Sequence, residues 1–214
     1  MLKKTVFLTI TLALILVFPG CQKKSPPPQM REPNQPSVSS SQTLQGEGIV
    51  LVDHQGSEVK LGDYAGKIIV LEWMNYDCPF VKPHYESGTF ATLAKNYAEK
   101  NVVWFGVNST NYATVETNKA WAEKNNVPYP ILDDHEGKLG KAYNATNTPH
   151  IYVMDAKGKT AYAGAIDNAP IGQLADGQAE YVNYADKALA ELTSGKSVTV
   201  SETKPYGCTV KYAN

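Results

Sequence analysis

The chain has 214 residues, and its 20 lysine and arginine residues against 21 acidic residues give a formal net charge of −1. Arg31 is the only arginine, and the lysines of the folded part are scattered, which argues against nucleic-acid binding. About 170 residues follow the N-terminal region, and that length suits one globular domain.

Residues 1–20 resemble a bacterial lipoprotein signal peptide. Two lysines precede an apolar run from Val6 to Phe18, and Gly20-Cys21 follows. The run is too short for a comfortable membrane span. We expect cleavage before Cys21 and lipidation of its thiol. Ordinary cleavage and an uncleaved anchor are the alternatives.

Residues 21–44 are rich in proline, serine, glutamine and lysine. Such a stretch cannot bury a hydrophobic core, and it predicts a disordered tether. Together with the signal peptide, it predicts a protein that is exported to the bacterial cell envelope and anchored to a membrane by lipid. The globular domain is expected over residues 45–195, followed by a tail over 196–214.

The globular part alternates short apolar strands with amphipathic helices. Strands are predicted over residues 48–52, 58–61, 68–74, 102–107, 129–132, 151–154 and 160–166. Helices are predicted over residues 79–100 with an interruption at Ser87-Gly88, and over 114–124, 137–143 and 179–192, the last with Tyr181 on its inner face. This order predicts an α/β fold with a central mixed sheet and helices on both faces.

Cys78 follows the apolar run 68–74 and a short polar turn, and Pro79 comes directly after it. This pattern is typical of a buried strand that passes into a helix. At a helix start, unpaired N–H groups and the helix dipole stabilise a thiolate, the nucleophilic form of sulfur. The position therefore suggests redox chemistry. The alternative is a small buried residue that closes a core strand.

The number of cysteines limits the possible pairings. If Cys21 carries lipid, only Cys78 and Cys208 remain, and they lie far apart in the sequence. Disulfides persist in exported proteins. Three outcomes stay open: a structural disulfide, a redox couple, or two thiols that do not meet.

Four features in this order and spacing resemble the thioredoxin superfamily, in particular its redoxin branch of AhpC/TSA-like, peroxiredoxin-like and membrane-tethered thiol-disulfide proteins. The resemblance covers roughly residues 46–195. The features are Val59 to Lys67, the strand and turn that lead to Cys78-Pro79, Asn147 to Val153, and the hairpin from Asp155 to Gly164. The resemblance implies a thioredoxin-like fold.

The resemblance also assigns roles to residues around Cys78. Thr148-Pro149 matches the family's cis-proline, which faces the active-site sulfur, and Thr148 would offer its backbone to a substrate strand. Pro79 would lie at the same binding surface. The alternative for Pro149 is a trans proline that opens an edge strand. Glu72 matches a buried acid beneath the sulfur, where a raised pKa suits proton transfer, and the alternative is a glutamate that reaches solvent.

His84 occupies a position where tethered members of the branch often carry a glutamate that moves protons, and the pKa of imidazole suits the same task. A surface histidine is the alternative. His84 and Cys78 are also half of a possible metal site, but no clear set of further ligands accompanies them. No metal and no cofactor are therefore expected.

The chain departs from the family patterns in several places. The second cysteine of C-x-x-C is replaced by Val81, so the usual resolving thiol is missing. The peroxiredoxin threonine and proline positions hold Asn75 and Leu71, and the folded part has no arginine. These changes argue against the usual peroxiredoxin geometry.

Cys208 is a candidate for the missing partner. It follows Gly207, which gives the backbone freedom to bring the thiol against another surface. Some peroxiredoxin-like members have a similar Gly-Cys tail. This resemblance implies that Cys208 resolves Cys78 or forms a disulfide with it. An intermolecular disulfide and a spare thiol are the alternatives.

The sequence thus predicts a membrane-tethered thiol-disulfide oxidoreductase with Cys78 as nucleophile and Cys208 as resolving cysteine. The expected partners are a protein disulfide or peroxide substrate and an external thiol reductant. Two alternatives are a peroxiredoxin-like peroxidase and a non-catalytic binding module that a Cys78–Cys208 disulfide staples.

Overall fold

The computed structural model describes residues 44–213. The predictions of a signal peptide, a tether and lipidation at Cys21 lie outside these described residues. Within residues 44–213, no helix has the length and apolar character that a membrane crossing requires.

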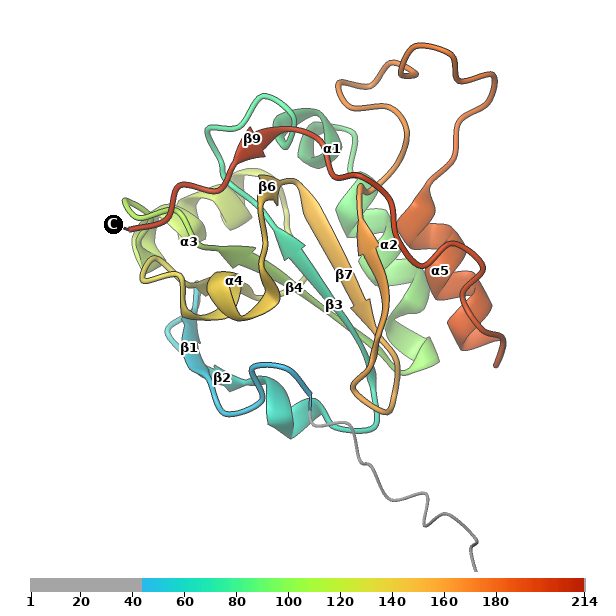
Figure 1. The fold of residues 1–214 in the computed structure, drawn as a ribbon. Helices are drawn as coiled ribbons and strands as arrows, with labels where there is room; N and C mark the ends of the chain where they lie inside the picture. Colours follow the sequence, from blue (N-terminus) through green and yellow to red (C-terminus); the bar gives the residue numbers. More distant parts are fainter. Residues whose placement is uncertain (1–43, 214) are drawn as a thin grey trace, which may run out of the picture. The chain divides into compact units, whose positions relative to one another are not determined.

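A seven-stranded mixed sheet forms the centre of the domain (Figure 1). Its strands are β1 (Val50–Asp53), β2 (Glu58–Lys60), β3 (Ile68–Trp73), β4 (Val102–Asn108), β5 (Ile131–Asp133), β7 (His150–Met154) and β8 (Thr160–Gly164). The strand order is β2-β1-β5-β4-β3-β7-β8. The β3/β4 and β4/β5 pairs are parallel, and the other pairs are antiparallel. The predicted mixed sheet is confirmed.

Strand β3 is buried along its whole length. It reads as a nearly continuous apolar run because side chains on both of its faces pack into a core. Ile68 and Val70 belong to one core, and Leu71 and Trp73 belong to the other. The strand that leads to Cys78 is therefore held on both faces.

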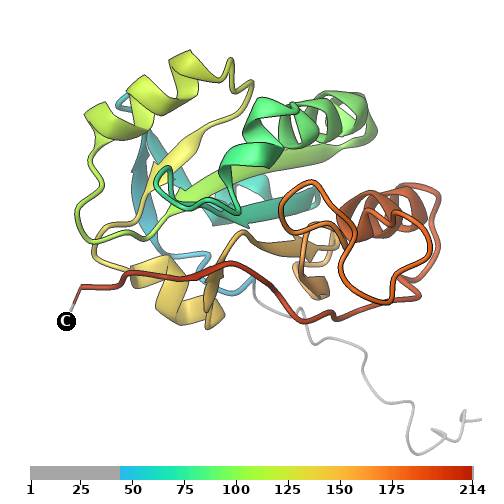
Figure 2. The same ribbon diagram turned by 90° about the horizontal axis from the view of Figure 1, so that it is seen from above.

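Helices cover both faces of the sheet, as predicted (Figure 2). On one face lie α1 (Lys82–Glu86), α2 (Thr89–Tyr97), α3 (Val115–Lys124) and α5 (Tyr184–Thr193), and the 3-10 helix η2 (Ala98–Lys100) continues α2. On the other face lie α4 (Lys138–Tyr143) and the 3-10 helix η1 (Leu61–Tyr64).

The predicted helix over residues 79–100 is wrong at its start. Its first helical residue is Lys82, because residues 78–81 form a turn in which Cys78 O accepts from the backbone N–H groups of Val81 and Lys82. Gly88, with φ +70°, then separates α1 from α2. The interruption predicted at Ser87-Gly88 is confirmed.

The last helix begins at Tyr184, five residues later than predicted. Asn183 caps it, since its side chain accepts from the Asp186 N–H at 2.8 Å. Residues 165–183 instead form a loop in which Tyr181 is 56% exposed, so its predicted inward position is wrong.

The C-terminal tail folds back along the domain. It passes α1 and reaches the edge of the short strand β6 (Asn147–Thr148), as Figures 1 and 2 show. There β9 (Cys208–Thr209) pairs with β6 in an antiparallel arrangement. The next residue, Val210, is buried, so this end of the tail is part of the core.

Candidate active site

Cys78 lies in a turn that the sequence stabilises locally. The Asn75 side chain accepts from the Asp77 N–H at 2.8 Å, and the Cys78 N–H donates to Asn75 O at 3.0 Å. The Cys78 side chain is 2% exposed. Because Cys78 precedes a helix of only five residues, nearby hydrogen bonds, and not a long helix dipole, determine its ionisation.

The structure brings Cys208 directly against Cys78. Both are free thiols, and their Sγ atoms are 2.9 Å apart. Cys208 reaches this position because it pairs with Thr148 across the β6/β9 ladder. Since a disulfide bond is about 2.05 Å long, the two sulfur atoms need to approach by less than about 1 Å to form one.

The two thiols have pKa values shifted in opposite directions. Burial raises the pKa of Cys78, but hydrogen bonds from the Cys208 thiol and from backbone groups outweigh it and leave this pKa below the ordinary thiol value. Burial and the neighbouring Cys78 sulfur raise the pKa of Cys208 to about 11. Cys78 is therefore the sulfur that ionises first and the better candidate for the nucleophile.

Gly207 permits the close approach of the tail. Its φ is +96°, and a Cβ on it would lie 2.2 Å from Thr148 O. Any side chain there must push β9 away from β6, and with it the Cys208 sulfur.

We predict that Gly207→Ala destabilises the protein by about 1–3 kcal/mol more than Gly172→Ala does. Gly172 is the matched control because it also has a positive φ of +77° but has open space where a Cβ would be added. Urea unfolding measures both free energies. Equal losses in the two variants would contradict the close packing of Gly207 on Thr148.

The Thr148–Pro149 peptide bond is cis, as predicted. Thr148 O lies 3.0 Å from Cys78 Sγ, and both Thr148 and Pro149 are buried, whereas Pro79 is exposed. The backbone edge at Thr148 pairs with Cys208 of the chain's own tail. A substrate strand at this edge is therefore in competition with the tail.

Glu72 is completely buried in the core that also contains Cys78. Its Oε2 accepts from Trp104 Nε1 at 2.9 Å and from the Tyr129 hydroxyl at 2.8 Å, while its Oε1 has no hydrogen-bond partner among residues 44–213. Burial raises its pKa to about 7, in spite of these hydrogen bonds. The predicted burial is confirmed, whereas a proton-transfer role stays a prediction because no hydrogen bond joins Glu72 to either sulfur.

His84 is also buried, and its contacts lead to the tail and not to Cys78. Its Nε2 lies 2.8 Å from the Tyr206 hydroxyl, and its Nδ1 lies 3.7 Å from Asp167 Oδ2. The Tyr206 hydroxyl donates to Asp167 Oδ1 at 2.9 Å. The sequence analysis missed Asp167 and Tyr206. The only sequence signal was that Tyr206 lies two residues before Cys208.

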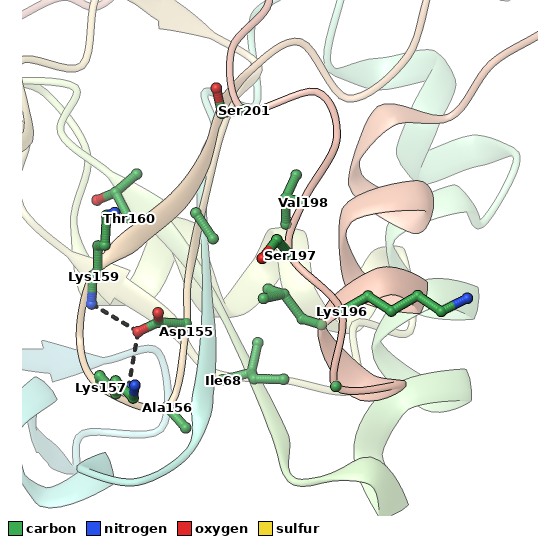
Figure 3. A pocket seen from close by; sticks show the side chains of 13 residues that line it. Ile68, Asp155, Ala156, Lys157, Lys159, Thr160, Lys196, Ser197, Val198 and Ser201 are labelled. Carbon is green, nitrogen blue, oxygen red and sulfur yellow. Dashed lines mark hydrogen bonds between the residues drawn. The ribbon is translucent and has the colours of Figure 1, made fainter.

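No group of three or more histidine, cysteine or acidic side chains in the described part of the chain is arranged to hold a metal ion. A cavity of about 710 Å³ lies near the start of β3, the end opposite Cys78, where Ile68 and Lys159 are among its lining residues (Figure 3). It contains no thiol and is not part of the candidate site.

The family AhpC/TSA matches residues 42–163, more than half of the chain. The chain belongs to the AhpC/TSA family. The resemblance to the redoxin branch of the thioredoxin superfamily is thus confirmed. Asp167, Tyr206 and Cys208 of this redoxin lie beyond the matched residues.

Similar proteins agree with this assignment. Peroxiredoxin-2 of Bos taurus is 28% identical over 140 residues, which cover 61% of this redoxin and 69% of the bovine chain. The crystal structure of an uncharacterised conserved protein from Geobacillus kaustophilus has a TM-score of 0.68 and 27% identity, and the match covers 80% of this redoxin and 93% of that chain. Peroxidoxin BcpB of Mycobacterium tuberculosis has a TM-score of 0.50 and 21% identity, with 70% and 94% of the two chains covered, and supports the thioredoxin-like fold alone.

This redoxin matches only part of the length of each curated relative. The matches span 64 to 69% of the length of four of them. The family match and the structural similarity establish the family and the fold. The activity has to be inferred from the geometry of the site.

Proposed function

We propose that this redoxin is a two-cysteine thiol oxidoreductase in which Cys78 is the nucleophile and Cys208 the resolving thiol. The observation that carries the proposal is the 2.9 Å distance between two free thiols whose pKa values are shifted in opposite directions. Membership of the AhpC/TSA family supports an oxidoreductase.

The reaction consists of two thiol exchanges. The Cys78 thiolate attacks a substrate disulfide, forms a mixed disulfide and releases one thiolate. The Cys208 thiolate then attacks Cys78 Sγ, releases the second substrate thiolate and leaves a Cys78–Cys208 disulfide. An external dithiol then reduces the Cys78–Cys208 disulfide to two thiols and is itself oxidised to a disulfide. The two electrons therefore come from that reductant.

Peroxide reduction is the second candidate, and the tail favours it. β9 covers the backbone edge at Thr148, where an extended protein substrate would pair, and a peroxide needs no such edge. The Cys78 thiolate would attack one peroxide oxygen to give a sulfenic acid and an alcohol or water. The Cys208 thiolate would then displace hydroxide and form the same disulfide.

The test is thiol trapping of the Cys21→Ser chain across a series of redox buffers, with peptide mass mapping. We expect one Cys78–Cys208 disulfide that opens at a mild potential. A disulfide that resists reduction would support the stapled binding module and contradict the enzyme. Thiols that never pair would contradict both.

We also propose that lipid on Cys21 holds this redoxin at a membrane of the cell envelope, because a basic start and an apolar run precede Gly20-Cys21 and a proline- and serine-rich sequence follows it. Cell fractionation tests the anchor. Wild type is expected in the membrane fraction and Cys21→Ser outside it. Equal distribution of the two proteins would contradict the anchor.

A further inference from the structure

Three polar side chains from distant parts of the chain meet beside the active site. They are Asp167 in the loop after β8, His84 in α1 and Tyr206 in the tail, and we call them the clasp. Asp167 and His84 are nearly inaccessible to solvent, and Tyr206 is half-buried. No hydrogen bond joins any of the three to either sulfur, so the chemistry proposed above does not use them.

The hydrogen bonds of the clasp determine the state of its members. The Tyr206 hydroxyl donates its proton to Asp167 Oδ1 at 2.9 Å. It must then accept from His84 Nε2 at 2.8 Å, which assigns the neutral imidazole proton to Nε2. Burial lowers the pKa of His84, against the effect of nearby Asp167, and is consistent with a neutral ring. The hydroxyl of the exposed Tyr181 also donates to Asp167 Oδ2, at 3.0 Å.

The clasp fixes the tail immediately before Cys208. Tyr206 is two residues upstream of that thiol, and its ring packs 6.2 Å from the ring of Phe80, which is two residues after Cys78. The tail is held independently on the other side of Cys208. There the Tyr212 hydroxyl donates to Ala145 O at 2.7 Å.

We infer that Asp167, Tyr206 and His84 are positioning residues that hold Cys208 against Cys78 for the resolving step. The inference rests on the proposed two-cysteine function and deepens it. Cys208 must attack Cys78 Sγ once a mixed disulfide has formed, and a fixed tail gives this thiol a high effective concentration. Without the clasp, the segment before Cys208 loses its hydrogen bonds to His84 and Asp167 and is held less firmly, and the attack slows.

The experiment uses Tyr206→Phe, which removes the hydroxyl and keeps the ring, in the full chain carrying Cys21→Ser. The probe is one molar equivalent of the aromatic disulfide dithiobis(nitrobenzoate). At this ratio, the second thionitrobenzoate comes from attack of the second thiol on the mixed disulfide, so the two steps are separated. The first thiol to attack releases one coloured thionitrobenzoate, and the attack of the second thiol on the mixed disulfide releases another. Stopped-flow absorbance records both phases.

We expect the first phase of Tyr206→Phe to stay within about twofold of wild type, and the second to slow about tenfold, as the loss of a hydrogen bond to a carboxylate implies. Tyr97→Phe is the matched control. It removes a tyrosine hydroxyl that donates to Asp186 at 2.7 Å, between α2 and α5 and away from the tail. It should leave both phases unchanged.

The outcomes separate this inference from the proposed function. An unchanged second phase in Tyr206→Phe, or an equal slowing in Tyr97→Phe, would overturn the positioning role alone. A wild-type chain that releases only one thionitrobenzoate forms no Cys78–Cys208 disulfide, and that result would overturn the proposed function and this inference together.

Discussion

Cys78→Ser is expected to abolish turnover, whereas Cys208→Ser is expected to accumulate adducts on Cys78. Serine at position 78 has no thiolate to attack a disulfide or a peroxide, so the rate should fall to that of the uncatalysed reaction. Serine at position 208 leaves the first step intact, but it cannot resolve the mixed disulfide or sulfenic acid. Intact-protein mass spectrometry distinguishes the two variants.

Cys21→Ser is the matched control for both variants. It removes the third cysteine, which precedes the described part of the chain. It should keep the full activity of the purified protein. Full activity in Cys78→Ser, in either a disulfide or a peroxide assay, would contradict the assignment of the nucleophile.

Glu72→Gln is expected to gain stability relative to the wild-type protein as the pH rises from 5 to 8. Burial raises the pKa of Glu72 from 4.5 to about 7 in the folded state. Between these values, the folded protein keeps a proton that the unfolded chain has lost. The contribution of Glu72 to the free energy of unfolding therefore decreases as the pH rises through this range, by about 3 kcal/mol for a shift of this size.

The measurement is urea unfolding of both proteins at pH 5 and pH 8. Glutamine keeps an oxygen that can accept from Trp104 and Tyr129, and its amide can donate to the Tyr85 hydroxyl, which has no partner in the structure. The variant should therefore match wild type at low pH and exceed its stability at pH 8. Glu99→Gln, at an exposed position of η2, is the control and should keep the wild-type pH dependence. A Glu72→Gln protein with the wild-type pH dependence would contradict the raised pKa.

The two results bear on different parts of the site. The cysteine variants test which sulfur starts the reaction and which one completes it. The Glu72 variant tests whether a proton is stored in the core beneath the site near neutral pH, as a proton-transfer role requires. The turnover rate of Glu72→Gln, which keeps Cys78, would then show whether this proton takes part in the reaction.

Local patterns in the sequence were sufficient for much of the fold. The apolar run before Cys78 predicted β3, because a strand that is buried on both faces needs apolar residues at nearly every position. The hairpin of β7 and β8 was predicted from its short glycine-containing turn. The family resemblance implied the burial of Glu72, and the apolar residues around it in β3 account for that burial.

The starts of two helices were predicted less well, because a backbone turn decides one of them and a side-chain cap the other. Because of the turn at Cys78, α1 begins only at Lys82, and because Asn183 is the cap, α5 begins only at Tyr184. The loop before Asn183 consequently places Asp167 beside α1. The spacing of apolar residues does not predict either of these helix starts.

The sequence alone determined that Cys78 follows a buried strand, that Thr148-Pro149 belongs to the same site, and that Cys208 is the remaining candidate partner. Only the tertiary structure decided that the two sulfurs meet, that β9 covers the Thr148 edge, and that His84 contacts Tyr206 and Asp167 in place of Cys78. The physical reason is the range of these contacts. A two-residue strand pair and hydrogen bonds between residues 39 to 122 positions apart depend on the folded path of the whole chain and leave no periodic pattern in any local window.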